Sequence, residues 1–353
     1  MIRLRPELAG LIPYSSGRSG AASDEQFAAL ALLASNELAF PPLPSVVEAI
    51  TRDAAFGHRY PDPDATALRE ALAARHQLSP DQVSLGAGSV EVARQALFAT
   101  VGPGDELLVA QPTFPEYAAI VTLIGGTTVT VPTLAWRHDL ESMAKAVSER
   151  TTAVVVCNPN NPTGTAVEAD EVIAFVQSLP DDLLVIVDEA YAEFARPAVL
   201  AGPALLETNP NVLVLRTFSK AYGLAGLRVG YGLSSPEVAE ALRRTRVPFG
   251  CSSLAQAAAL ASLEAGDELA ARIAATVRER ERILPQLRAL GLEVPTPEGN
   301  FWWVRGGDRA DELEDGLLAR QLLARRGGNA FRITVGTPEE NDRLVAALGE
   351  LLA

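Results

Sequence analysis

The sequence has few of the residues that build disulfide frameworks or metal centres. Its two cysteines, Cys157 and Cys251, are too few for a disulfide framework or a zinc knuckle. Its three histidines, His58, His76 and His138, match no spacing typical of a metal site or a catalytic triad. The sequence also has no P-loop and no HExxH motif. These absences exclude several common enzyme classes and leave the function open.

Long apolar runs and excess positive charge are missing too. The first residues lack the apolar run of a secretory signal peptide, and no stretch is long and apolar enough to span a bilayer. The formal net charge is −14, which argues against non-specific binding to nucleic acid or to anionic membranes. We therefore expect a cytoplasmic protein that works on small molecules and binds neither nucleic acid nor membrane.

The hydrophobic pattern predicts an α/β fold. With 353 residues, 48% of them hydrophobic, the chain can form one large or two moderate domains. From about residue 83, short apolar runs alternate with helical segments, which is typical of a doubly wound, mainly parallel sheet. The seven runs are 82–85, 106–110, 127–131, 153–157, 183–187, 212–216 and 228–232.

The segments on either side of this sheet predict a smaller α+β domain. An irregular arm precedes helices at 45–54, capped by Ser45, and at 66–76. A long helical stretch, 252–290, leads to further elements: a strand at 301–304, a helix at 311–325, a strand at 331–335 and a final helix from 337. The predicted divisions are an arm with part of the small domain (1–45), a large domain (46–250), a linking helix (251–290) and the small domain (291–353).

Residues with possible chemical roles follow the predicted strands where each strand ends. In parallel sheets, ligands bind beyond the carboxyl ends of the strands. Because all of these residues belong to one edge of one sheet, they predict a single site. They are Gly88, Ser89 and Val90 after the first strand, Phe114 after the second, Asn161 after the fourth, Asp188 and Tyr191 after the fifth, and Lys220 after the sixth.

Lys220 is the residue on which the functional hypothesis depends. A buried ammonium group is costly to desolvate, so this lysine needs a partner or a chemical role. One such role is to lose its proton and form a Schiff base with an aldehyde cofactor. Arg228, eight residues on, suits an anionic group such as that cofactor's phosphate. The alternative is a surface lysine on a turn, which the glycines at 223 and 226 and the position after a strand disfavour.

The turn at 86–91 resembles a phosphate-binding turn at a helix N-terminus. Glu91 stands where the dinucleotide fingerprint has its last glycine, so that fingerprint is excluded. An ordinary strand-to-helix turn is the alternative. Phe114 stacks on a planar ring or simply packs.

The other polar candidates each have two interpretations. Asp188 is a counter-ion to a protonated ring nitrogen or a helix N-cap. Tyr191 donates to a phenolate oxygen or packs in the core. Asn161 points into a site or only forms a turn. Arg332, a lone charge on an apolar strand, binds a carboxylate in bidentate fashion or forms an edge-strand salt bridge.

Together the motifs resemble the fold-type I pyridoxal-phosphate aminotransferases, in the branch of histidinol-phosphate aminotransferases and their aromatic-amino-acid paralogues. The resemblance rests on residues 158–164, 188–191, 219–228 and 331–336 and runs over nearly the whole chain. Residues 3–11 and 247–256 look like the actinobacterial aromatic (phenylalanine) aminotransferases.

The resemblance implies a role for each cofactor residue. Lys220 forms the Schiff base with pyridoxal phosphate and shuttles a proton to the substrate α-carbon. Asp188 keeps the pyridine nitrogen protonated, so that the ring acts as an electron sink. Asn161 and Tyr191 hold the phenolic oxygen, and Phe114 stacks on the ring. The phosphate is held by Gly88, Ser89, Val90, Thr217, Ser219 and Arg228; Val90 replaces an acidic residue of many relatives, which leaves its backbone contact possible.

The resemblance also implies substrate and partner contacts. Arg332, with Asn161, takes the substrate α-carboxylate, and Tyr14 and Asn36 close over the substrate. Tyr60 reaches the phosphate of the neighbouring subunit, which implies a homodimer with active sites at the interface.

Two departures from the family concern the substrate. Residues 36–39 read Asn-Glu-Leu-Ala in place of Asn-Glu-Asn-Pro. The connection 324–331 reads as too short to hold a strand that relatives carry there, together with its arginine, which helps bind the side-chain phosphate of histidinol phosphate.

The expected reaction is amino transfer from a phenylalanine-like aromatic amino acid to 2-oxoglutarate. The first alternative is histidinol-phosphate aminotransferase, which would use the same residues. A decarboxylase of the same family and a cofactor-free binding protein are two further alternatives. A cofactor-free binding protein would show no Schiff-base absorbance, and Lys220→Ala would leave its properties unchanged.

Overall fold

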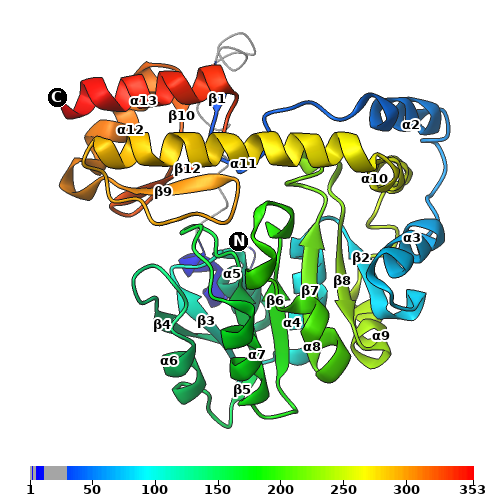
Figure 1. The fold of residues 1–353 in the computed structure, drawn as a ribbon. Coiled ribbons are helices and arrows are strands. Elements are labelled where there is room, and N and C mark those ends of the chain that lie inside the picture. The colour runs from blue at the N-terminus through cyan, green and yellow to red at the C-terminus, as the bar shows by residue number, and fades with distance from the viewer. Residues whose placement is uncertain (1, 3–4, 12–29) are drawn as a thin grey trace.

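The large lobe of the molecule is a seven-stranded sheet covered by helices on both faces (Figure 1). The computed structural model describes residues 2, 5–11 and 30–353. The strand order is β2-β8-β7-β6-β5-β3-β4, with β8 antiparallel to both of its neighbours and the other pairs parallel. The strands are β2 (Val83–Gly86), β3 (Glu106–Gln111), β4 (Thr127–Pro132), β5 (Thr151–Cys157), β6 (Leu184–Asp188), β7 (Val212–Thr217) and β8 (Gly230–Ser234). The predicted fold class is confirmed.

Apolar side chains on both faces of the central strands explain why this sheet is covered on both sides. Successive residues of a strand point to opposite faces, so a continuous Val/Ile/Leu run needs packing on each. One face packs on α4 (Ser89–Thr100), α5 (Glu116–Ile124) and α9 (Pro236–Thr245). The other face packs on α3 (Thr66–His76), α6 (Leu140–Lys145), α7 (Ala169–Gln177), α8 (Gly202–Thr208) and α10 (Ser253–Glu264).

Helix boundaries agree with the prediction at α3 and differ at α2 and in the stretch 252–290. Helix α2 (Pro44–Ala54) begins with a proline in its first turn, and Leu43 occupies the N-cap position, so the predicted Ser45 cap is wrong. The predicted stretch 252–290 divides into α10 and α11 (Gly266–Ala289) at Ala265. The glycine that follows explains the break, because glycine is a poor helix former.

The small lobe is a three-stranded antiparallel sheet of order β11-β12-β9, packed on helices. Trp302 and Val304 of β9 (Phe301–Arg305) and Phe331 and Ile333 of β12 (Ala330–Thr334) point into its core. The alternating residues, Arg332 among them, therefore lie on the opposite face. The remaining elements are α12 (Ala310–Ala319), β11 (Arg325–Gly327), α13 (Pro338–Leu352) and the parallel pair β1 (Ala31–Leu32) and β10 (Leu322–Leu323).

The segment before β12 corrects two predictions. The helix predicted for 311–325 ends at Ala319, and Gln321 takes a left-handed conformation (φ 61°) that ends it. Strand β11 follows, so the prediction that this connection lacks a strand and its arginine is wrong. Arg325 of β11 lies opposite Arg332 of β12. The run of Leu, Ala and Arg has good helix propensity, and tertiary pairing overrides it.

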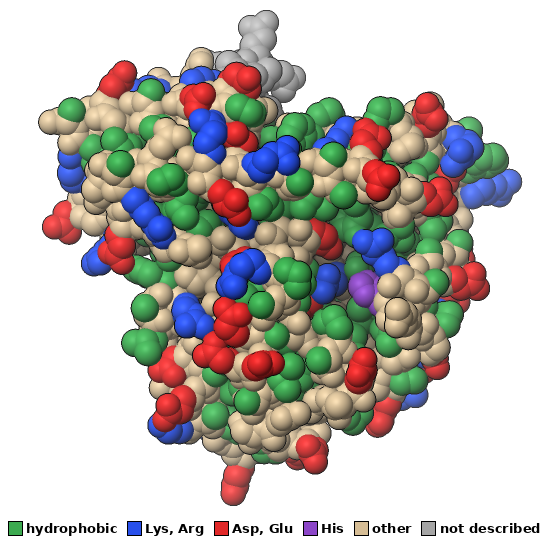
Figure 2. Space-filling model, viewed as in Figure 1, with side chains coloured by type: hydrophobic (Ala, Val, Ile, Leu, Met, Phe, Trp, Pro, Cys, Tyr) green, Lys and Arg blue, Asp and Glu red, His purple; other side chains and the backbone are tan. Residues whose placement is uncertain are grey.

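Several short features complete the fold. The 3₁₀ helices are Pro6–Gly10, Pro80–Gln82, Ala192–Phe194, Pro197–Val199, Ala225–Leu227 and Gly307–Arg309. Among the described residues, no helix is both long and apolar enough to cross a membrane. Figure 2 shows acidic and basic side chains interspersed over one face of the molecule. The predicted domain boundaries stay predictions.

Candidate active site

The carboxyl ends of the central strands surround a cavity of about 430 Å³, to which the small lobe contributes Arg332. The pairing of Cys157 with Asp188 and of Asp188 with Leu215 brings the ends of β5, β6 and β7 to one level. The predicted site residues that line the cavity are Ser89, Val90, Phe114, Asn161, Asp188, Tyr191, Thr217, Ser219, Lys220, Arg228 and Arg332.

Lys220 lies in this cavity with its amine hydrogen-bonded to the carbonyl oxygen of Ser35, 2.9 Å from Nζ. Burial, followed by the positive charge of Arg332, lowers the pKa of Lys220 from 10.5 to about 7. Arg228 acts in the same direction, and Glu37 and Asp188 oppose it. The amine is therefore partly neutral near pH 7, and a neutral amine is the nucleophile that Schiff-base chemistry needs.

Asp188 ends β6 as a buried carboxylate at the wall of the cavity. It accepts hydrogen bonds from Tyr117 Oη at 2.5 Å and from the backbone N–H of Ala190 at 3.0 Å. Burial raises the pKa of Asp188, and the hydrogen bond from Tyr117 opposes that rise. A carboxylate in such surroundings is suited to pair with a cationic N–H of a ligand.

Tyr117, which donates to Asp188, was not singled out from the sequence. It lies three residues after Phe114, at the start of α5, and its ring meets that of Phe114 edge-on with centroids 5.5 Å apart. The segment after β3 drew attention to Phe114 alone. A polar aromatic side chain in a segment that follows a strand was the available signal.

The N-terminus of α4 and Arg228 form an anion cradle. Gly88 has a left-handed backbone (φ 86°), and a Cβ there would collide with the guanidinium of Arg228. Arg228 donates to Ser219 Oγ at 3.2 Å and to the carbonyl oxygens of Ala225 and Ala87. The free N–H groups at a helix N-terminus and a nearby guanidinium together favour a phosphate.

The second half of the site joins the two lobes. Arg332, 8% exposed, donates from Nη1 to Asn161 Oδ1 and from Nη2 to the carbonyl oxygen of Ala34, both at 2.6 Å. Strand β12 is the central strand of its sheet, so the edge-strand alternative for Arg332 is wrong. Asn36, which is buried, donates from Nδ2 to Tyr191 Oη at 2.8 Å.

Tyr60 does not line this chain's cavity. Tyr60 is 82% exposed and stacks on Phe249, with ring centroids 4.5 Å apart. Its predicted contact with a neighbouring subunit stays a prediction. Tyr14 lies outside the described residues.

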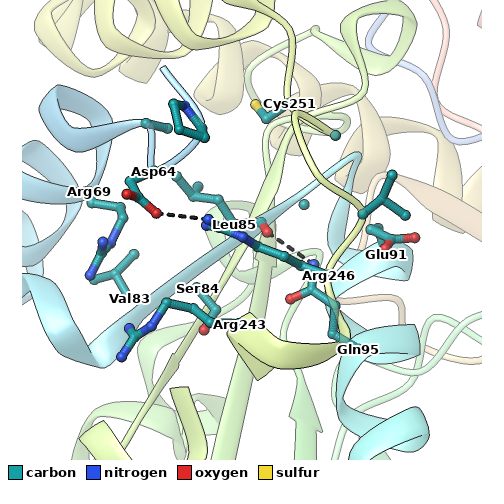
Figure 3. Close-up of a pocket in the computed structure, with 15 residues that line it drawn as sticks. Asp64, Arg69, Val83, Ser84, Leu85, Glu91, Gln95, Arg243, Arg246 and Cys251 are labelled. Atoms are coloured by element: carbon teal, nitrogen blue, oxygen red, sulfur yellow. Dashed lines mark hydrogen bonds and ion pairs between the residues drawn. The ribbon is translucent and has the colours of Figure 1, made fainter. Parts of the chain in front are cut away.

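A smaller cavity of about 30 Å³ lies beside β2 (Figure 3). Its charged side chains are already engaged within the chain. Arg246 pairs with Asp64 at 2.8 Å, and Arg69 donates to the carbonyl oxygen of Pro80. The larger cavity, with its amine, carboxylate and anion cradle, is therefore the better candidate active site.

The donor set of the larger cavity fits pyridoxal phosphate. The cofactor carries an aldehyde, a phosphate, a basic ring nitrogen and a phenolic oxygen. The cavity holds an amine of lowered pKa, an anion cradle and a buried carboxylate, together with the hydroxyl of Tyr191. Each functional group of the cofactor thus has a chemical counterpart in the cavity.

Comparison with known proteins agrees with this chemistry. The sequence pattern of the family described as "Aminotransferase class I and II" matches residues 29–348. An aromatic amino acid aminotransferase of Thermobifida fusca (strain YX) is 47% identical over 96% of this chain and 94% of its own. An aromatic amino acid aminotransferase of Mycobacterium avium (strain 104) is 43% identical over 97% of this chain and 96% of its own.

The crystal structure of a histidinol-phosphate aminotransferase from Sinorhizobium meliloti, in complex with pyridoxal-5'-phosphate, has a similar fold. It superposes with a TM-score of 0.92 and 33% identity over 100% of this chain and 98% of that one. The resemblance predicted from the motifs is confirmed.

Proposed function

The chain belongs to the class I and II aminotransferases, a pyridoxal-phosphate-dependent family that acts on amino acids and 2-oxo acids, and from that premise we propose that it transfers the amino group of an aromatic amino acid to 2-oxoglutarate. One observation carries the choice of donor. The relatives with 43–47% identity over nearly the whole chain are named for aromatic amino acids.

The arrangement of the cavity supports amino transfer through pyridoxal phosphate. When bound, the cofactor supplies an aldehyde carbon and a conjugated ring that accepts electrons. Its phosphate would be bound by Arg228, Ser219, Thr217 and the N-terminus of α4, at Gly88, Ser89 and Val90. Asp188 would hold a proton at the ring nitrogen of the cofactor, because a buried carboxylate is stabilised by a cationic partner.

Residues on the other side of the cavity are proposed to bind the substrate and act on it. Nζ of Lys220 would hold the cofactor and would carry a proton to and from the substrate α-carbon. Its lowered pKa suits this, since a general base works best with a pKa near the working pH. Arg332 would bind the substrate α-carboxylate, and Asn161 and Tyr191 would orient the phenolic oxygen of the cofactor. Phe114 covers the ring, and Asn36 holds Tyr191 in place at 2.8 Å.

Histidinol phosphate is the second candidate donor. Arg325, on β11, lies opposite Arg332 in the small sheet. Two arginines side by side on adjacent strands favour a substrate with two anionic groups, or one with a phosphate on its side chain. The aromatic donor remains our choice because the relatives named for it cover nearly the whole chain.

A competition experiment tests the proposal. Purified enzyme with 2-oxoglutarate is given phenylalanine and histidinol phosphate, and kcat/KM is measured for each donor. We expect a higher kcat/KM for phenylalanine. A strong preference for histidinol phosphate would overturn the choice of donor. In that case Arg325→Ala would reduce kcat/KM for histidinol phosphate and leave that for phenylalanine unchanged.

A homodimer with Tyr60 at the interface is part of the proposal. Phe56, Tyr60, Val247 and Phe249 are exposed aromatic and aliphatic side chains, and Tyr60 and Phe249 stack on each other. Exposed apolar clusters of this kind are typical of protein–protein contacts. Sedimentation at micromolar concentration tests it, and a monomer would contradict it. The cytoplasmic location stays a prediction.

A further inference from the structure

A largely buried ion pair, Glu189 with Arg216, lies next to the active site, with the Arg216 side chain 11% exposed. Glu189, 0% exposed, accepts two hydrogen bonds from Arg216 at its Oε2, from Nη2 at 2.5 Å and from Nε at 3.0 Å. Its Oε1 accepts the backbone N–H of Gly202 at 2.9 Å. Two guanidinium donors thus meet one carboxylate oxygen and the backbone satisfies the other, which fixes the orientation of the Glu189 side chain.

The place of this pair in the sequence connects it to the site. Glu189 immediately follows Asp188 at the end of β6, and Arg216 immediately precedes Thr217 at the end of β7. Lys220 follows three residues after Thr217. The ion pair thus joins the two strand ends that carry the carboxylate and the amine of the cavity.

We infer that Glu189 and Arg216 are positioning residues, whose ion pair sets the separation and relative orientation of Asp188 and Lys220. This inference rests on the proposed aminotransferase function. Neither side chain lines the cavity. They act through the backbone of the adjoining residues, and the β6–β7 ladder transmits the constraint, since Asp188 pairs with Leu215.

Stability alone gives little reason for a pair of this kind. Desolvating two charges costs about as much as their attraction returns, so apolar replacements of buried pairs are often neutral or stabilising. A two-pronged hydrogen-bonded pair holds strand ends in one register in a way that apolar contacts do not.

The surroundings are shaped to this pair. A Cβ at position 202 would lie 2.8 Å from Oε2 of Glu189, so a glycine is needed there. Glu193 adds a second, longer contact, 3.9 Å from Nη1 of Arg216. Burial works to lower the pKa of Arg216, and the charges of Glu189 and Glu193 raise it overall, so the guanidinium stays charged.

The test removes both charges together, because the loss of one would leave the other unpaired and buried. The double variant Glu189→Met/Arg216→Met removes one charge of each sign. Its effect on Lys220 therefore reflects a change in the position of the amine more than a change in the electrostatic field at the amine. The matched control is Glu106→Met/Arg150→Met. Glu106 is also a buried carboxylate paired with an arginine, but it lies at the amino end of β3, at the opposite edge of the sheet.

Three quantities are measured on the enzyme with cofactor bound: the pH midpoint of the cofactor's absorbance change, kcat and KM with phenylalanine, and the dissociation constant of the cofactor. For the double variant we expect the pH midpoint of the absorbance change to move. We also expect kcat to fall by about 10- to 100-fold, because small misplacements of reacting groups reduce rates by such factors. KM should change little, because Arg332 belongs to the other lobe. The control should match the wild type in all three.

Arg216→Lys is a second test variant, to be used if the double variant does not fold. It keeps the charge and loses the two-pronged geometry, and we expect the same changes in smaller measure. A folded double variant, or failing that Arg216→Lys, with the wild-type midpoint and wild-type kcat would overturn the inference. A wild-type protein with no Lys220-dependent absorbance would overturn the proposed function and this inference together. A wild type that prefers another donor would change only the substrate.

Discussion

Nη1 of Arg332 lies 2.6 Å from Oδ1 of Asn161, so one hydrogen bond connects the small lobe to the large lobe inside the cavity. Nη2 of the same guanidinium is held by the carbonyl oxygen of Ala34, also at 2.6 Å. The guanidinium is thus held at the cavity wall by neutral oxygens. A substrate carboxylate is a stronger partner for it than a neutral oxygen.

Arg332→Lys is the first prediction. Lysine keeps the charge and loses the planar fork, so the α-carboxylate loses a two-pronged contact and Asn161 loses its donor. We expect kcat/KM for the amino donor to fall by about 10- to 100-fold, mainly through KM. Steady-state kinetics measures it. Arg305→Lys, on the neighbouring strand and paired with Glu293 at the surface, should behave as wild type. An unchanged KM in Arg332→Lys would show that Arg332 does not bind the substrate carboxylate.

Lys220→Ala should abolish covalent attachment of the cofactor. We expect loss of the Schiff-base absorbance and a fall in kcat of at least about 10³-fold, since both the nucleophile and the proton carrier are gone. The only other lysine in the sequence, Lys145, is exposed and paired with Glu141. Reduction with borohydride followed by peptide mapping should therefore label Lys220 in the wild type and in Lys145→Ala. A label on Lys145, or activity in Lys220→Ala, would contradict the assignment.

The lowered pKa of Lys220 makes the stability of the cofactor-free protein depend on pH. The folded-state pKa of about 7 lies below the ordinary value of 10.5, so the unfolded chain binds more protons between these two values. The contribution of the Lys220 amine to the free energy of unfolding must therefore rise with pH between these two pKa values. Below about pH 7 that contribution is constant. Lys220→Met removes the effect.

The measurement is the difference in Tm between cofactor-free wild type and cofactor-free Lys220→Met from about pH 6 to about pH 10. We expect the Tm of the wild type to rise relative to that of the variant as the pH rises. The contributions of the other titratable groups are common to both proteins and cancel in the difference. A flat difference would show that Lys220 has its ordinary pKa.

Tyr117→Phe tests the hydrogen bond to Asp188. Because Tyr117 opposes the rise in the pKa of Asp188, its loss should raise that pKa further and weaken the hold on a protonated ring nitrogen. We expect the dissociation constant of the cofactor to rise by about tenfold, as for a hydrogen bond to a charged group. Tyr222→Phe, another buried tyrosine, whose ring packs on Phe218, is the control. Equal cofactor affinities in the two variants would contradict a role for this bond.

The proposed contact of Tyr60 with the neighbouring subunit predicts complementation. Tyr60→Ala should bind the cofactor more weakly, and Lys220→Ala should be inactive. In a mixed dimer, one site combines the intact Lys220 of one subunit with the intact Tyr60 of the other. Mixing the two variants, with exchange of subunits, should therefore restore tight cofactor binding in up to about a quarter of the sites. No recovery in a sample that contains mixed dimers would show that Tyr60 serves its own chain's site or none.

The sequence by itself determined the elements whose cause is local. Short apolar runs that alternate with helical segments predicted all seven strands of the large sheet, and α3 was predicted to the residue. It also placed Lys220, Asp188, Asn161 and Arg228 at one edge, because the carboxyl ends of parallel strands meet there. Those inferences need only periodicity and chain direction.

Only the tertiary structure decided which side chains meet. The bonds of Tyr117 to Asp188, of Asn36 to Tyr191 and of Arg332 to Asn161 join residues far apart in the chain. Strand β11 forms because β12 offers it a partner, against the helix propensity of its own residues. The Glu189–Arg216 pair depends in the same way on the register of β6 and β7. Such contacts follow from long-range pairing and packing, and no local pattern contains them.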